Sequence, residues 1–271
     1  MLPAFIVAFR EILEIAIILG VVLAATLGIE GRRFWVMLGI VSGILGSVII
    51  AFFTENIANF FAGFGQEILN ASILFIASLM IIWTAIWMST HAKNLIAHIK
   101  NKSVKIIDGD LPLHTISIII ALAVLREGSE IVLFSYGMLV SGEKIHNIIL
   151  GIISGTIVSS ILGILIYFSI IAIPTKYIFK VSTYLLVFLA AGMASIGAQN
   201  LVAADFFSNY SSELWDSSFL LTEESIVGKI LHSLFGYVSR PTLIQVIFYL
   251  GTVGVFFISN YLVKKNSLKK I

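Results

Sequence analysis

Five segments of about 20 residues each are almost wholly apolar and contain no charged side chain. A helix needs about 20 such residues to cross the hydrocarbon core of a bilayer, which is about 30 Å thick. Of the 271 residues, 59% are hydrophobic and 12% are charged. Soluble domains are typically about a quarter charged, so a water-soluble core cannot accommodate this apolar excess. The sequence therefore predicts an all-α, polytopic membrane protein that forms a single membrane domain.

Two further segments have the same length and character but contain three charged residues each. With these two, we expect seven membrane-spanning helices, in which the first and fourth are the charged ones. The expected spans are Pro3–Leu27, Phe34–Phe53, Ile68–Thr90, Thr115–Val140, Ile148–Ile173, Val181–Ala203 and Thr242–Val263.

The basic residues of the connecting segments indicate the orientation of the chain, because cytoplasmic loops are enriched in Lys and Arg. Twelve of them fall on one side: Arg32, Arg33, Lys93, Lys100, Lys102, Lys105, Lys176, Lys180, Lys264, Lys265, Lys269 and Lys270. Only Lys144, Lys229 and Arg240 fall on the other. We therefore expect the N-terminus outside the cell membrane and the C-terminus in the cytoplasm.

The outer side is correspondingly acidic, which either concentrates cations near an entrance or reflects only the avoidance of positive charge there. The net charge of +2 gives no reason to expect a nucleic-acid partner. The chain has no cysteine, which excludes thiolate metal sites and cysteine nucleophiles.

Two sequence patterns occur twice. Arg10-Glu11-Ile12-Leu13-Glu14 returns 116 residues later as Arg126-Glu127-Gly128-Ser129-Glu130, and residues 38–43 return 112 residues later as residues 150–155. The first three spans thus correspond to the next three. An odd number of spans per copy requires the second copy to be inverted, and inverted repeats place a shared site near the midplane. We expect a first repeat at 1–100, a second at 110–203, an outer loop at 204–241, and a seventh helix with a basic tail at 242–271.

The glycine pairs in these repeats, Gly39 with Gly43 and Gly151 with Gly155, are typical of surfaces where two membrane helices pack closely.

The Arg-Glu-x-x-Glu pattern places three ionisable groups on one helix face, because residues three or four apart are neighbours on a helix. By helix rise, the two copies overlap in depth within the bilayer. Burying such groups costs about 2.5–3.5 kcal/mol each at a helix centre, so intramembrane charges mark functional sites. A purely structural alternative is a pair of intrahelical ion pairs that dock neighbouring helices.

Four glutamates and two arginines leave a net charge of −2, which favours a cation. Carboxylates alone suit hard ions such as Mg²⁺, Ca²⁺, Mn²⁺ or ferric iron. We predict Glu11, Glu14, Glu127 and Glu130 as metal ligands. Arg10 and Arg126 would keep the carboxylates ionised while no cation is bound. An entering cation would then displace the guanidinium groups from the carboxylates. The five histidines (His91, His98, His114, His146 and His232) fall in loops or at span ends, which argues against a ferritin-like di-iron centre.

At these residues the chain resembles the oxidase-dependent iron permease family, which includes the fungal high-affinity iron permease and the bacterial EfeU-type transporters. The family's hallmark is the Arg-Glu-x-x-Glu motif in the first and fourth of seven spans. Further similarity lies in residues 65–67, 87–88, 214–218, 234–237 and 240–241. The resemblance implies an iron permease that imports iron, usually ferric, supplied by a separate ferroxidase or periplasmic donor protein. It implies no organic cofactor and no enzymatic activity.

Three alternatives remain at this point. The first is a transporter of another hard cation such as Mn²⁺. The second is an intramembrane enzyme that uses the glutamates as acid and base, although no nucleophile or histidine accompanies them in depth. The third is a structural or sensor protein that binds the metal without transporting it.

Candidate entrance ligands lie on the acidic outer side. Glu67 begins the third span, where it either binds the entering ion or stabilises the helix N-terminus. Asp205 and Asp216 belong to the outer loop, whose acids either collect metal or form a solvated surface. In the same loop, apolar residues from Ile226 to Phe235 recur at helical spacing, which predicts a short amphipathic helix ending at Gly236.

Overall fold

The computed structural model describes residues 1–60, 66–107, 112–168, 175–207, 210 and 212–268. This part of the chain is all-helical, with a single isolated bridge between Glu213 and Thr242 in place of any strand. The elements are α1 (Leu2–Ala25), α2 (Arg32–Phe60), α3 (Gln66–Ile107), α4 (His114–Val140), α5 (Ile145–Tyr167), α6 (Thr175–Ala203), α7 (Ile226–Phe235) and α8 (Leu243–Leu268).

Five helices are long and apolar enough to cross a membrane: α2, α3, α5, α6 and α8, over residues 32–53, 67–87, 145–167, 179–203 and 243–263. These correspond to the five uncharged segments of the sequence. The apolar stretch of α8 is only 6% buried, and α2 exposes Leu45, Val48 and Phe52. Such continuous apolar surfaces require a lipid environment. The helices α1 and α4 have similar lengths, 24 and 27 residues. They differ from these five apolar stretches in that each contains three charged residues.

Glycines set the closest helix contacts, as the sequence predicted. On α2, a Cβ built on Gly39 would lie 2.8 Å from Ile120 Cβ, and one on Gly43 would lie 2.6 Å from Val124 Cβ. On α5, a Cβ on Gly151 would lie 2.7 Å from Ala4 Cβ. These distances leave no room for a side chain, so α2 packs directly on α4 and α5 packs directly on α1.

The two contact surfaces correspond residue by residue. Gly39 contacts Ile120, and Gly151, 112 residues after Gly39, contacts Ala4. Ala4 and Ile120 are 116 residues apart. Ser47 and Ser159, also 112 apart, donate hydrogen bonds to the carbonyls four residues before them, at 3.1 and 2.6 Å. The offsets are those between the repeated sequence patterns.

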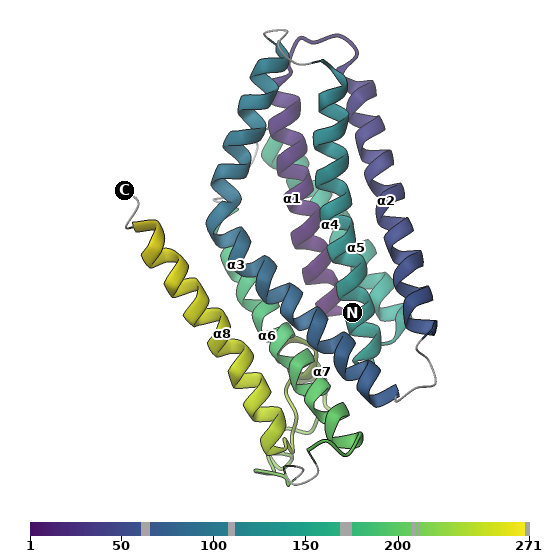
Figure 1. Cartoon of the computed structure of the whole chain (residues 1–271), viewed down its shortest axis with the longest axis vertical. Helices are drawn as coiled ribbons and strands as arrows, with labels where there is room; N and C mark the ends of the chain where they lie inside the picture. The colour runs from purple at the N-terminus through teal and green to yellow at the C-terminus, as the bar shows by residue number, and fades with distance from the viewer. Residues whose placement is uncertain (61–65, 108–111, 169–174, 208–209, 211, 269–271) are drawn as a thin grey trace.

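The helices α1 and α4 run in opposite directions (Figure 1). Successive glycines of α2 contact successively later residues of α4, so these two helices are parallel. A short turn after Ala25 reverses the chain between α1 and α2. It follows that α4 is antiparallel to α1.

Two apolar clusters divide the bundle along its length. The first contains Val7 of α1 and Phe134 of α4, and the second contains Val22 of α1 and Ile120 of α4. On α1, the Arg-Glu-x-x-Glu residues lie between Val7 and Val22. On α4, they lie between Ile120 and Phe134. The folded chain therefore holds both motifs at the same level, between the two apolar clusters.

The third predicted span lies within a longer helix, and the fifth ends beyond the described residues. The third span was expected at Ile68–Thr90, and the apolar stretch of α3 covers residues 67–87. The helix itself continues to Ile107, because residues 91–107 contain neither glycine nor proline. His91 and His98 therefore belong to a helix and not to a loop. The predicted end of the fifth span, at Ile173, lies outside the described residues.

The amphipathic helix of the outer loop is confirmed as α7. The Ser225 side chain accepts a hydrogen bond from Gly228 N at its start, and Gly236 ends it with φ +65°.

Some basic residues used for the orientation have side chains outside the described part of the chain: Lys93, Lys100, Lys102, Lys105, Lys176, Lys264, Lys269 and Lys270.

Candidate metal centre

The first motif forms a closed ion cluster inside the bundle. Arg10 Nη1 donates a hydrogen bond to Glu11 Oε1 at 3.0 Å, and Arg10 Nη2 lies 3.3 Å from Glu14 Oε1. All three residues are buried, with Arg10 exposing only 1% of its surface. The helical spacing that places them on one face thus gives a guanidinium shared by two carboxylates, shielded from solvent.

The second motif has the same residues in a more open arrangement. Arg126 Nε lies 3.3 Å from Glu130 Oε1 and 3.7 Å from Glu127 Oε1. The Arg126 guanidinium also stacks 4.2 Å from the ring centroid of Trp87 on α3, and its side chain is 33% exposed. Arg126 is therefore held by an aromatic face as well as by carboxylates.

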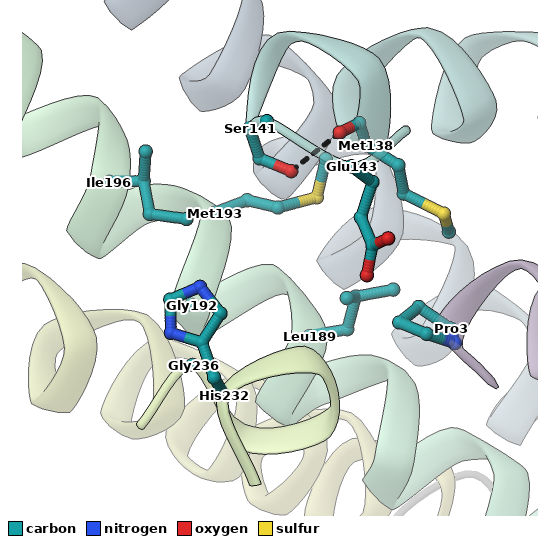
Figure 2. A pocket seen from close by; sticks show the side chains of 11 residues that line it. Pro3, Met138, Ser141, Glu143, Leu189, Gly192, Met193, Ile196, His232 and Gly236 are labelled. Carbon is teal, nitrogen blue, oxygen red and sulfur yellow. Dashed lines mark hydrogen bonds between the residues drawn. The ribbon is translucent and has the colours of Figure 1, made fainter. Parts of the chain in front are cut away.

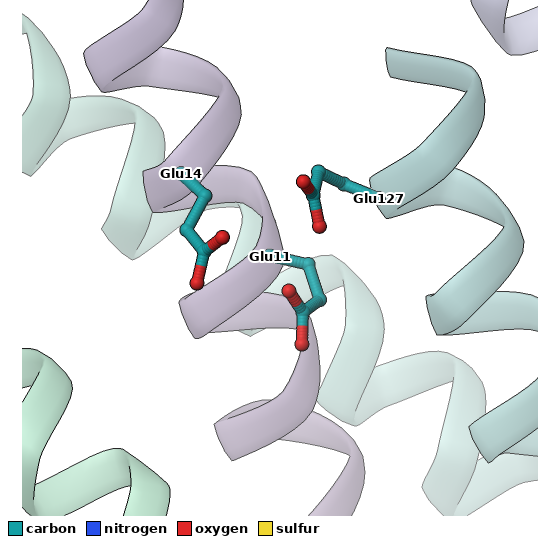
Figure 3. Close-up of side chains that lie close together, drawn as sticks. All are labelled: Glu11, Glu14 and Glu127. Atoms are coloured by element: carbon teal, nitrogen blue, oxygen red, sulfur yellow. The ribbon is translucent and has the colours of Figure 1, made fainter. Parts of the chain in front are cut away.

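Three carboxylates from the two helices converge. Oxygens of Glu11, Glu14 and Glu127 lie within 4.8 Å of one another, and all three residues are buried. Figure 3 shows Glu127 directed from α4 toward the two glutamates of α1. Glu130 is not in this group, because its carboxylate is directed to Arg126, but it does interact electrostatically with Arg10 and Glu11.

The chemistry of this group of glutamates fits a cation. Glu11 Oε2, Glu127 Oε2 and Glu130 Oε2 are buried and accept no hydrogen bond from the described residues. Glu14 Oε1 has only its ion pair with Arg10. Leaving such oxygens without a partner costs about 1–3 kcal/mol each, and more when they are charged. A cation among them would remove that cost and balance the like charges.

The candidate entrance ligands lie apart from this cluster. Glu67 is exposed in the first turn of α3, and Asp205 is exposed with φ +67°. Asp216 is exposed and already engaged, since it accepts hydrogen bonds from Ser218 and pairs with Arg240 at 3.0 Å. The hydrogen bond from the Ser218 hydroxyl, with smaller contributions from Ser218 N and Arg240, lowers the pKa of Asp216.

The sequence reasoning missed two neighbours of the second motif. The first is Trp87, which no spacing rule connects to Arg126. The second is Ser47, whose Oγ lies 2.2 Å from the Cβ position of Gly128. Glycine inside the second motif thus allows α2 to approach, and a small residue at that place was the only signal available.

Known proteins are similar to this chain along most of its length. Residues 1–271 match the Iron permease FTR1 family. The "Ferrous iron permease EfeU" of Yersinia pestis is 25% identical over 253 residues, covering 92% of this chain and 89% of the relative. The protein of the same name from Escherichia coli O6:K15:H31 is 24% identical over 250 residues, covering 91% and 90%. No solved structure matches.

Proposed function

Because the chain belongs to the iron permease FTR1 family, we propose that it imports iron across the cell membrane and binds it between the two Arg-Glu-x-x-Glu motifs. The observation that carries this proposal is the convergence of Glu11, Glu14 and Glu127 within 4.8 Å, inside the bundle and from two antiparallel helices. Iron is the substrate that passes through, and the three carboxylates are its ligands. Glu130 is the fourth ligand, reached when Arg126 moves away from it.

The arginines make the binding reversible. Arg10 interacts electrostatically with all four carboxylates, two on its own helix and two on α4. It compensates part of their charge while the ion is absent, and an arriving cation competes with it for the same oxygens. Arg126 is the more accessible of the two, because part of its side chain is exposed, and Trp87 would still hold its guanidinium when a cation binds the carboxylates.

The architecture proposed with this function is seven spans, a 3+3 inverted repeat and an additional last helix. The matching contacts of Gly39 and Gly151, and the opposite directions of α1 and α4, support the repeat. The domain limits predicted from the sequence, 1–100, 110–203, 204–241 and 242–271, follow from it. The excess of basic residues supports a cytoplasmic C-terminus and an outer N-terminus.

On the outer side, we propose that Glu67, Asp205 and Asp216 attract iron toward the entrance, supplied by a separate ferroxidase or donor protein. Asp216 does so by its charge, because its oxygens are engaged by Ser218 and Arg240. A membrane potential that is negative inside would assist import by about 2.3 kcal/mol per charge per 100 mV.

The oxidation state of the iron can be decided by transport measurements. The resemblance predicts ferric iron, whereas the relatives' names specify ferrous iron. Carboxylate oxygens accept both ions, as well as Mn²⁺, the alternative substrate. The alternative of an intramembrane enzyme is set aside, because the family and its relatives are permeases.

The test is ⁵⁵Fe uptake by cells that lack their own iron permease. We expect Glu14→Gln and Glu127→Gln to lose nearly all uptake at normal membrane levels, because each removes a charged ligand without changing side-chain size. Glu224→Gln, an exposed substitution in the outer loop, is the matched control and should retain uptake. Ascorbate-reduced iron, ferric citrate and competing Mn²⁺ distinguish the substrates. Full uptake by Glu14→Gln or Glu127→Gln would remove the site assignment.

A further inference from the structure

A cavity lies at one end of the bundle, and none of the four motif glutamates lines it. Its volume is about 100 Å³, and it is lined by residues from four helices and two turns (Figure 2). A water molecule occupies about 30 Å³ in the liquid, so the cavity can hold a small ion with part of its hydration shell. Potential metal ligands among the lining residues are His232, Glu143, Met138 and Met193.

His232 presents one ring nitrogen in the form that binds metals. Its Nδ1 lies 2.7 Å from the carbonyl oxygen of Tyr237. A carbonyl oxygen can only accept, so Nδ1 carries the hydrogen, and the neutral ring has its lone pair on Nε2. Metal-binding histidines almost always donate their second ring nitrogen to a carbonyl or carboxylate in this way. The arrangement fixes both the tautomer and the orientation of the ring.

Close glycine packing holds His232 at the cavity. Gly236 ends α7 in the left-handed conformation, and its N–H donates to the carbonyl of His232 at 2.9 Å. A Cβ built on Gly236 would lie 2.4 Å from Gly192 Cα on α6. The end of α7 is thereby pressed onto α6, beside Met193.

Glu143 is fixed in a similar way by the turn after α4. Gly142 adopts φ +96°, and Glu143 N donates to the carbonyl of Met138 at 3.0 Å, which is the pattern of a Schellman motif. The turn therefore holds Glu143 close to the backbone of Met138. The Met1 amino group lies 3.5 Å from Glu143 Oε2, so this carboxylate already faces a cation.

The two methionines connect this cavity to the interior. Met138 and Met193 are 2% exposed and also belong to the first apolar cluster, with Val7 and Phe134. That cluster separates the cavity from the glutamates at positions 11, 14 and 127. An ion leaving the cavity toward those glutamates would pass the methionine thioethers first.

We propose that this cavity is a second iron site, which binds Fe²⁺ through His232 Nε2, the Glu143 carboxylate and the Met193 thioether before the ion reaches the glutamate cluster. The inference rests on the proposed iron transport and adds a site with different chemistry. Imidazole and thioether are softer ligands than carboxylates, so they favour ferrous over ferric iron and disfavour Mn²⁺. The cavity site thus selects Fe²⁺. The ion then moves to the glutamates, which accept several hard cations.

The experiment measures Fe²⁺ binding to the purified full-length protein in detergent, under anaerobic conditions, by equilibrium dialysis with iron quantification. We expect Glu11→Gln/Glu14→Gln/Glu127→Gln to retain one Fe²⁺ per chain. Adding His232→Gln should lower its affinity at least about tenfold, since even the loss of a ligating histidine's partner costs about 10–100-fold. His114→Gln, at the opposite end of α4, is the matched control and should leave the affinity unchanged.

Met193→Leu keeps the side-chain size and provides a second measurement that does not depend on the triple variant folding. In the otherwise wild-type chain, it should weaken Fe²⁺ binding and leave Mn²⁺ binding unchanged. Equal Fe²⁺ binding with and without His232→Gln, or equal effects of Met193→Leu on both ions, would overturn the proposal. Neither result would affect the uptake test of Glu14→Gln, so failure of the cavity site and failure of the transport site are distinguishable.

Discussion

The two arginines of the repeated motif should contribute unequally to stability, although their sequences correspond. Arg10 is 1% exposed and lies 3.0 and 3.3 Å from two carboxylates. At an effective dielectric constant near 20, each contact corresponds to about 5 kcal/mol of attraction, against which desolvation of the charges must be set. Removing one partner of a buried ion pair costs about 3–5 kcal/mol. We therefore expect Arg10→Gln to lower the free energy of unfolding by about 3–5 kcal/mol.

Substitution of Arg126 should lower the free energy of unfolding by less. Its side chain is 33% exposed, and its distances to the two carboxylates, 3.3 and 3.7 Å, are longer than those of Arg10, 3.0 and 3.3 Å. It also contacts the ring of Trp87. Solvent-exposed ion pairs contribute about 0–1 kcal/mol and a cation–π contact about 0.5–2 kcal/mol. For Arg126→Gln we expect a loss of about 1–2 kcal/mol.

The assay is equilibrium unfolding in mixed detergent micelles with an increasing fraction of sodium dodecyl sulfate, followed by circular dichroism. Arg33→Gln, an exposed substitution at the start of α2, is the control and should change stability by less than about 0.5 kcal/mol. Equal losses for Arg10→Gln and Arg126→Gln, or a larger loss for Arg126→Gln, would refute the reasoning from burial.

Two further predictions concern packing and the outer loop. Gly43→Leu should destabilise the fold by about 1–3 kcal/mol or more, because its Cβ would lie 2.6 Å from Val124 Cβ; the same unfolding assay should show no change for Gly251→Leu, whose Cβ meets nothing within 4 Å. Asp216 should titrate below the ordinary aspartate range by NMR, so its stabilising contacts persist at neutral pH and are lost as the pH falls through its lowered pKa. Ser218→Ala should move that midpoint upward, and an unchanged midpoint would contradict the assigned cause.

Much of the fold followed from local sequence. Apolar length predicted seven membrane-spanning helices, and five helices of the described residues are long and apolar enough to cross a membrane. Glycine spacing predicted the close contacts of α2 and α5. Helical spacing also predicted that each motif would place its charges on one face. These features depend on residues a few positions apart, which is why they could be recognised without a structure.

Features that depend on distant residues could not be predicted. Three glutamates converge instead of four, and the fourth, Glu130, pairs with Arg126. Arg126 itself contacts Trp87 of α3, a contact that no local pattern indicates. The cavity at the end of the bundle is lined by Glu143, Met193 and His232 from separate elements. His232 had been interpreted only as lying in a loop or at a span end. The continuation of α3 from the predicted span to Ile107 was not predicted, because residues 91–107 were interpreted as a connecting loop.

The central claim is that glutamates from two antiparallel helices bind one iron ion together. The most direct test is anomalous diffraction at the iron absorption edge, from crystals grown in lipid with iron. The account predicts a peak bordered by the carboxylates of Glu11, Glu14 and Glu127. Bound iron elsewhere in the protein with no peak at this position, or carboxylates of α1 and α4 that face lipid, would contradict it.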